Sequence, residues 1–169
     1  HVYVRRVSDG QIYLVERDLL QTIKYARSRL ADHSLFSLTR KKVAAATIQT
    51  AQGTLNTTQK NAADKAKARW VRTGAPDEAA EQLTTWMGKA LKLKGTRFAD
   101  PDDPPTDLQP RFTLALIDDQ GRTERLKVSQ VGPEGDWYGQ SGHTRGLVKL
   151  VRSSARSLAD DVQAVIEGE

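Results

Sequence analysis

The chain has 169 residues, of which 38% are hydrophobic and 28% are charged, and it contains no cysteine. This length is typical of a domain with its own hydrophobic core, and the absence of cysteine excludes disulfides, thiolate metal sites and cysteine nucleophiles. The formal net charge of +5 is unevenly placed, because residues 1–97 hold 18 Lys+Arg and 8 Asp+Glu, whereas residues 98–169 hold 8 and 13. A basic first part of this kind can attract nucleic acid, anionic lipid or an acidic protein surface.

The sequence contains no apolar run close to the roughly 20 residues that a membrane-spanning helix requires. It begins without methionine, at HVYVRRV, which alternates like a strand and lacks the basic and apolar regions of a signal peptide. We therefore expect a fragment whose targeting segment lies upstream.

The N-terminal part predicts a hairpin followed by a helix. Alternating apolar residues flank an Asp-Gly pair at 9–10, which is a strong hairpin signal, and predict strands at 2–7 and 11–16. Asp18 is a candidate helix N-cap, and apolar residues at helical spacing predict an amphipathic helix over 19–31.

The middle of the chain predicts a second hairpin, a further strand and a helix. The stretches KKVAAATIQT and TLNTTQK flank a turn at 51–53, and AKARWVRT predicts a strand that ends before Gly74. The helix DEAAEQLTTWMGKALKLK, at 77–94, has acids at its start and lysines at its end, as the helix dipole favours. Four prolines and four aspartates at 100–110 predict a rigid connector that is neither helix nor central strand.

The last part predicts two further hairpin segments and a helix. RFTLALIDDQGRTERLKVSQV alternates around a turn at 118–121. The glycine-rich stretch GPEGDWYGQSGHTRG, at 132–146, predicts strand, turn and strand, because it lacks the lysine of a phosphate-binding loop and precedes a strand rather than a helix. LVKLV, at 147–151, predicts the strand that follows this stretch. The terminal segment predicts a helix with Leu158, Val162 and Val165 on one side.

Candidate chemistry is sparse. The glycine-rich stretch contains Asp136, Ser141 and His143, but hydrolase triads are assembled from distant positions, so closeness in sequence does not support one. The connector's aspartates lack the spacing and closing glutamate of a calcium loop, and the histidines lie far apart. We expect a non-enzymatic protein with no catalytic residues, no cofactor and no metal site, and keep a hydrolase at the glycine-rich turn as a third hypothesis.

Basic and aromatic side chains form the candidate contact surface. Alternation places the basic residues of the strand around Trp70 on one face and Trp70 on the other, so we expect Trp70 and Trp86 in the core. The predicted contact residues are Arg40, Lys41, Lys42, Lys65, Lys67, Arg69, Trp137 and Tyr138.

The two ends of the chain have the same order of predicted elements. VYVRRVSDGQIYLVERDLLQTI and WYGQSGHTRGLVKLVRSSARSL each give strand, glycine-bearing turn, strand, polar cap and helix. This similarity predicts an internal repeat, in which 1–31 is the closing hairpin and helix of a preceding unit and 32–169 is a complete unit, packed together as one globular fragment. We expect an α+β fold of antiparallel β-hairpins with three covering helices.

Several short motifs follow one another in an order that resembles a bacterial family. VYVRRVSDGQIYLVERDLL is similar to an aromatic hairpin and helix, RLADHSLFSLTRKKVAAATIQT to a passage from arginine through FSL into a strand, and TDLQPRFTLALIDDQGRTERLKVSQ to a proline-led hairpin. Trp70 is similar to a strand tryptophan, whereas Asp107 stands where glycine is expected. With these motifs over nearly its whole length, the chain resembles the family described as domain of unknown function 4340.

The resemblance implies an extracytoplasmic or periplasmic protein, tethered by an upstream membrane segment and associated with export or gliding-type ABC transporter components. It implies no catalytic residues. We therefore expect a non-enzymatic interaction module with a protein partner in a membrane-associated assembly. The alternative is a binder of nucleic acid or another anionic polymer through the basic face of residues 1–97.

Overall fold

The computed structural model describes residues 1–20, 32–64, 67–75, 80–144 and 146–168. The chain separates into two compact units, 1–32 and 33–169. The fold is mixed α+β with antiparallel sheets, which confirms the predicted class at this level. Among the described residues, no helix is long and apolar enough to cross a membrane.

The first unit is a hairpin followed by the beginning of a helix. Its strands, β1 (Val2–Arg5) and β2 (Ile12–Val15), pair antiparallel as predicted. Gly10 adopts a left-handed φ of +74° in the turn, a conformation that glycine reaches without strain. Residues 17–20 are helical, and the remainder of the helix predicted over 19–31 lies outside the described residues.

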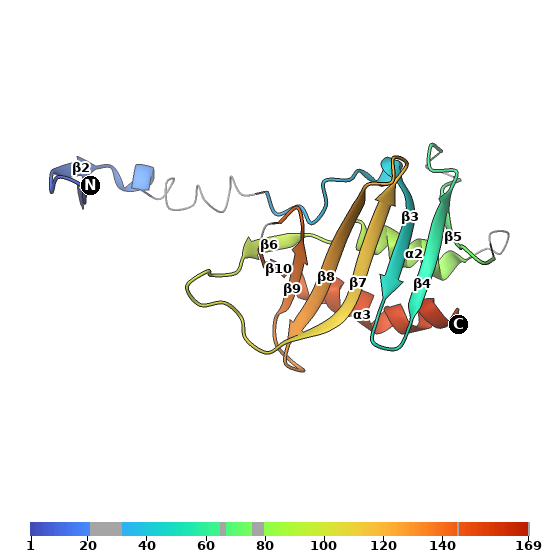
Figure 1. Ribbon diagram of the computed structural model, residues 1–169. Coiled ribbons are helices and arrows are strands. Elements are labelled where there is room, and N and C mark those ends of the chain that lie inside the picture. The colour runs from blue at the N-terminus through green and yellow to red at the C-terminus, as the bar shows by residue number, and fades with distance from the viewer. Residues whose placement is uncertain (21–31, 65–66, 76–79, 145, 169) are drawn as a thin grey trace. The chain divides into compact units, whose positions relative to one another are not determined.

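The second unit contains an eight-stranded antiparallel sheet. Its strands are β3 (Val43–Gln49), β4 (Thr54–Lys60), β5 (Arg69–Arg72), β6 (Gly95–Phe98), β7 (Leu108–Asp118), β8 (Thr123–Val131), β9 (Trp137–Ser141) and β10 (Val148–Leu150). Their spatial order is β5-β4-β3-β7-β8-β9-β10-β6 (Figure 1). Two meanders, β3-β4-β5 and β7-β8-β9-β10, therefore meet where β3 pairs with β7. The predicted hairpins of the second unit are confirmed.

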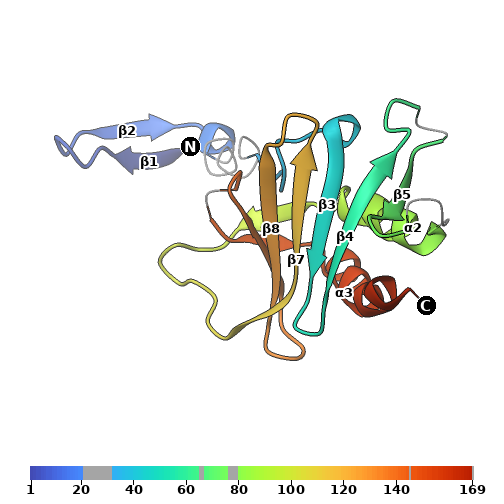
Figure 2. The same cartoon turned by 45° about the vertical axis from the view of Figure 1, so that its right-hand side comes forward.

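Two helices, α2 (Glu81–Ala90) and α3 (Arg152–Glu167), cover one face of this sheet (Figure 1, Figure 2). Trp86 of α2 joins three elements, because its Nε1 donates to the Leu158 carbonyl of α3 at 2.9 Å and its ring packs edge-on against Phe112 of β7. Trp70 and Trp86 are 0% and 2% exposed, which confirms their predicted place in the core. The residues that the two helices bury are Leu83, Trp86, Met87 and Ala90 from α2, and Ala155, Leu158, Val162 and Val165 from α3.

The proline-rich connector is shorter than predicted. The prediction that 100–110 contains no central strand is wrong, because β7 begins at Leu108 and contains Pro110. The strand accommodates this proline at an irregularity, since its register with β8 shifts between Pro110 and Phe112. A bulge is one of the few places where a sheet tolerates a residue without an N–H group.

Two other boundaries differ from the prediction. Arg40–Lys42 form a 3-10 turn, η1, before β3, instead of opening the strand. α2 ends at Ala90 rather than at 94, because Leu93 packs in the core beyond the helix and Lys94 bridges to Ser34. The short strand β6, which follows and pairs with β10, is not predicted by its sequence GTRF.

Candidate functional site

The eight-stranded sheet has two faces of different character. In β7, Leu114 points toward the helices and is fully buried, whereas the neighbouring Thr113 points the other way. The same alternation in β8 buries Leu126 and exposes Arg125 and Lys127. We call the side that packs against α2 and α3 the covered face, and the opposite side the open face.

The open face is basic. The eight strands contain two acidic residues, Asp118 and Glu124, and both belong to the covered face because Glu124 lies opposite Leu116 and Asp118 follows Leu116 by two positions. The charged strand residues of the open face are all basic: Lys60, Arg69, Arg97, Arg125, Lys127 and Lys149. We refer to Arg97, Arg125, Lys127 and Lys149, which lie on β6, β8 and β10, as the open-face basic patch.

Two pairs of basic side chains lie directly opposite each other on neighbouring strands. Lys60 is paired with Arg69 across β4 and β5, and Lys149 with Arg97 across β10 and β6. Like charges in such positions destabilise an antiparallel pair. Lys149 forms an ion pair with Asp136. Within the described part of the chain, no carboxylate pairs with Lys60, Arg69 or Arg97. The open face therefore carries an electrostatic cost that an acidic ligand would relieve.

The structure separates the basic residues that were predicted as a contact surface. Lys41 and Lys42 are exposed in η1, ahead of β3. Lys67 is exposed and lies 3.8 Å from the carboxylate of Asp64. Arg69 belongs to the open face, on the edge strand β5. The side chain of Arg40 and the whole of Lys65 lie outside the described residues.

The two predicted aromatic contacts point to opposite faces of β9. Trp137 lies on the covered face and is 2% exposed, with the guanidinium carbon of Arg111 at 5.8 Å from its ring centroid. Tyr138 lies on the open face, directly opposite Lys149, and is half-buried. Of the two aromatic residues, Tyr138 is therefore the one that adjoins the open-face basic patch.

The triad-like residues have other partners. The Ser141 hydroxyl accepts the N–H of Thr144 at 3.2 Å, and the Thr144 hydroxyl accepts the N–H of Ser141 at 3.0 Å. Asp136 is paired with Lys149, and His143 is exposed in the turn. Reciprocal bonds of this kind between hydroxyls and backbone are typical of turns, so they account for Ser141 without a nucleophilic role.

Asp118 is the buried carboxylate of the sheet. Its burial opposes ionisation, but the Arg122 guanidinium at 2.6 Å and the N–H groups of Arg122 and Gln120 together outweigh that effect. The pKa of Asp118 is therefore lowered from its ordinary value. These bonds close the turn between β7 and β8, which gives Asp118 a structural role.

Within the described residues, no group of three or more His, Asp or Glu side chains is arranged to hold a metal ion. In the acidic connector, the Asp100 carboxylate accepts the N–H of Asp102 at 3.1 Å. Such local bonds are the usual reason for aspartate in turns.

None of the four residues of the open-face basic patch is among the contact residues predicted from the sequence. Arg125 and Lys127 lie two positions apart in a hairpin whose alternation was recognised, so their common face was available from the sequence. The pairing of Arg97 with Lys149 was not available from the sequence, because β6 was not predicted and β7, β8 and β9 separate it from β10 along the chain.

No protein-family model matches the sequence, and comparisons with curated proteins and with solved structures find no match either. The geometry of the open face is therefore the main evidence on function.

Proposed function

We propose that the chain is a non-enzymatic interaction module of a membrane-tethered, extracytoplasmic protein that is accessory to an ABC-type transporter. The motif order that resembles domain of unknown function 4340 supports this setting. The observation that supports a binding role is the open face, whose charged strand residues are all basic and include two directly opposed like-charge pairs.

The partner that fits this face is a protein with an acidic surface. Arg125 and Lys127 project from one strand and have no ion-pair partner among the described residues. Lysine and arginine N–H groups form their strongest hydrogen bonds with carboxylates and phosphates. The rest of the face is mostly threonine, glutamine and alanine, which offer little apolar area. Charge therefore dominates recognition, and binding should weaken with salt.

A second candidate is a nucleic acid or another anionic polymer, bound through the same face. The observation that favours it is the place of Tyr138, opposite Lys149 and one strand from Lys127. An aromatic ring beside basic side chains is the arrangement on which single-stranded bases stack while their phosphates are held.

The two candidates are separated by the binding of the full chain to immobilised poly-L-glutamate and to single-stranded DNA, measured by biolayer interferometry at increasing salt. A protein partner predicts tighter binding to polyglutamate, and loss of that binding when Arg125 and Lys127 are both changed to glutamine. The control changes Lys89, in the last turn of α2, and Lys92, just beyond the helix, to glutamine, which removes the same charge from another part of the unit.

Equal losses in the two double variants would contradict a specific role for the open face. Tighter binding to DNA, with a further loss in Tyr138→Leu, would favour the second candidate.

The membrane-tethered setting has its own test, which is the coding sequence upstream of His1. Tethering by a helix requires an apolar segment of about 20 residues there. An upstream sequence without such a segment, or recovery of the whole native protein in the cytoplasm, contradicts the setting and leaves the binding role to stand separately.

The internal repeat and a third covering helix belong to the same proposal. Their support is that β1-β2 and β9-β10 are both antiparallel hairpins followed at once by helical residues, 17–20 and α3. Tyr3 and Leu14 of the first hairpin are 77% and 58% exposed, whereas a two-stranded hairpin needs cover to be stable. A chain extended by a preceding repeat should exchange its β1-β2 amide hydrogens more slowly, and unchanged exchange rates would count against the repeat.

A further inference from the structure

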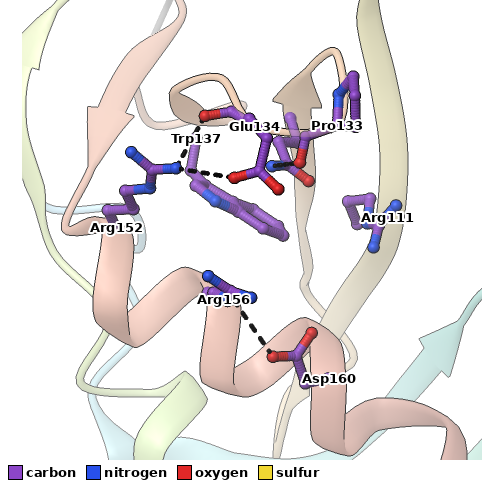
Figure 3. Close-up of a pocket in the computed structure, with 8 residues that line it drawn as sticks. Arg111, Pro133, Glu134, Trp137, Arg152, Arg156 and Asp160 are labelled. Carbon is purple, nitrogen blue, oxygen red and sulfur yellow. Dashed lines mark hydrogen bonds and ion pairs between the residues drawn. The ribbon is translucent and has the colours of Figure 1, made fainter.

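A small pocket lies on the covered side of the sheet, where the first turns of α3 approach β7 and the turn before β9 (Figure 3). Its cavity volume is about 90 Å³. This is the volume of roughly three water molecules, well below the roughly 300 Å³ at which pockets for drug-sized ligands begin. The pocket therefore fits one compact chemical group.

Hydrogen-bond donors dominate this pocket. Arg111 of β7 and two arginines of α3, Arg152 and Arg156, line it, and Figure 3 shows the indole of Trp137 among them. Trp137 is 2% exposed, and its Nε1–H is buried and has no acceptor among the residues that the structure describes. A buried donor without a partner is unfavourable, so this indole points to an acceptor that the described residues do not supply.

The acceptors around the pocket already have donors other than the Trp137 indole. The Pro133 carbonyl accepts from Gln130 Nε2, and the Glu134 carbonyl accepts from Arg152 Nη2, both at 2.8 Å. The Glu134 carboxylate lies 3.5 Å from Arg152, but its side chain is 85% exposed. Ion pairs with such exposed carboxylates are weak, so a better-placed anion can replace them.

The remaining charges also favour an anion. Arg156 pairs with Asp160 at 3.6 Å, and both side chains are largely exposed. Arg111 lies over the indole ring, and no carboxylate pairs with it in the part of the chain that the structure describes. α3 begins at Arg152 without a side-chain cap and without an acidic residue in its first turn. A helix start is electropositive, so an arginine there is unfavourable unless an anion balances it.

We infer that this pocket binds a compact oxyanion, either a carboxylate or a phosphate group, between the guanidinium groups of Arg111, Arg152 and Arg156. The Trp137 indole N–H is the fourth donor. Guanidinium groups match both anions with parallel N–H···O bonds. The site is independent of the proposed function, because the pocket and the open-face basic patch lie on opposite sides of the sheet.

The test follows the indole N–H signals of the three tryptophans by NMR, during titration of the full chain with inorganic phosphate or acetate at constant ionic strength. The Trp137 signal, identified by its loss in Trp137→Phe, should move and reach saturation. The Trp86 signal should stay in place, because its N–H already donates to Leu158. Saturation by only one of the two anions identifies the ligand as a phosphate or as a carboxylate.

Three variants test the geometry. Arg156→Gln, at a largely exposed position that does not threaten folding, should raise the dissociation constant about tenfold, the usual effect of losing one charged hydrogen bond. Glu134→Gln should lower it, because the competing carboxylate is removed. Arg125→Gln, on the open face, should leave it unchanged.

A Trp137 signal that saturates with neither anion overturns the inference. So does an equal loss of affinity in Arg125→Gln and Arg156→Gln, because that pattern indicates attraction to net charge and not to this pocket.

Discussion

The covered and the open face of the eight-stranded sheet are made by alternate residues of the same strands, yet they differ in almost every property. In β8, Leu126 is 1% exposed and packs in the core, while its neighbours Arg125 and Lys127 are exposed and have no ion-pair partner among the described residues. We therefore expect stability to depend on Leu126, and the proposed binding of an acidic partner to depend on Arg125 and Lys127. Substitutions of the buried residues of the covered face should change the free energy of unfolding, and those on the open face should change the binding of the proposed acidic partner.

The largest change in the free energy of unfolding is expected at Trp86 of α2, which packs against the covered face. Trp86→Ala removes a buried ring that packs on Phe112 and a hydrogen bond to Leu158, and it should lower the free energy of unfolding by about 3–5 kcal/mol. Arg125→Ala should change it by no more than about 0.5 kcal/mol. Urea unfolding measures both, and similar losses in the two variants would show that the open face also contributes to the stability of the sheet.

A smaller loss is expected where β6 packs against β10. A Cβ at Gly95 would collide with the Val148 side chain and lie 3.0 Å from the His33 carbonyl, so Gly95→Ala should cost about 1–3 kcal/mol. A Cβ at Gly88, within α2, would meet no described atom within 4 Å beyond its chain neighbours and the backbone of its own helix, and Gly88→Ala should stabilise the chain by up to about 1 kcal/mol. Thermal unfolding distinguishes the two, and a stabilising Gly95→Ala would contradict the close approach of β6 to β10.

The effect of Asp118 depends on pH. Because the pKa of Asp118 is lowered in the folded chain, its contribution to stability is fully present above its unfolded pKa of about 3.9 and is lost as the pH falls through the folded value. Asp118→Asn should therefore lower the melting temperature at pH 7, and the difference from the original chain should shrink below about pH 4. A difference that is the same at both pH values would show that the ion pair with Arg122 is not its cause.

The covered face was largely predictable from the sequence, whereas the order of the strands was not. Phe112, Leu114 and Leu116 alternate through β7, so their common burial followed from the period of a strand. The pairing of β3 with β7 and of β6 with β10 depends on contacts between distant segments, which local periodicity does not contain. Pro110 was misjudged for a related reason, because the bulge that accommodates it is a property of its pairing with β8.

The candidate site, like the fold, was predictable from the sequence only in part. Alternation shows that Trp137 and Tyr138 point in opposite directions, but which of them meets a helix is decided by the packing of α3 against β9. Counting charge along the chain indicated that the basic character ends near residue 97. In the folded sheet, however, Arg125, Lys127 and Lys149 lie on the same face as Arg97.

The smallest expected effect tests whether a like-charge pair of the open face lowers the stability of the sheet. Arg69→Glu replaces the like-charge pair with Lys60 by an opposite-charge pair, and it should stabilise the sheet by about 0.2–1 kcal/mol. Arg125→Glu is the matched control, because the residue opposite Arg125 on β7 is Ala115, so the substitution removes no like-charge pair. Both variants should bind polyglutamate less well, but only Arg69→Glu should unfold at higher urea. Binding sites commonly retain residues that lower stability. A gain of stability in both variants would mean that general charge repulsion on the open face, rather than the opposed pair of Lys60 and Arg69, lowers the stability of the sheet.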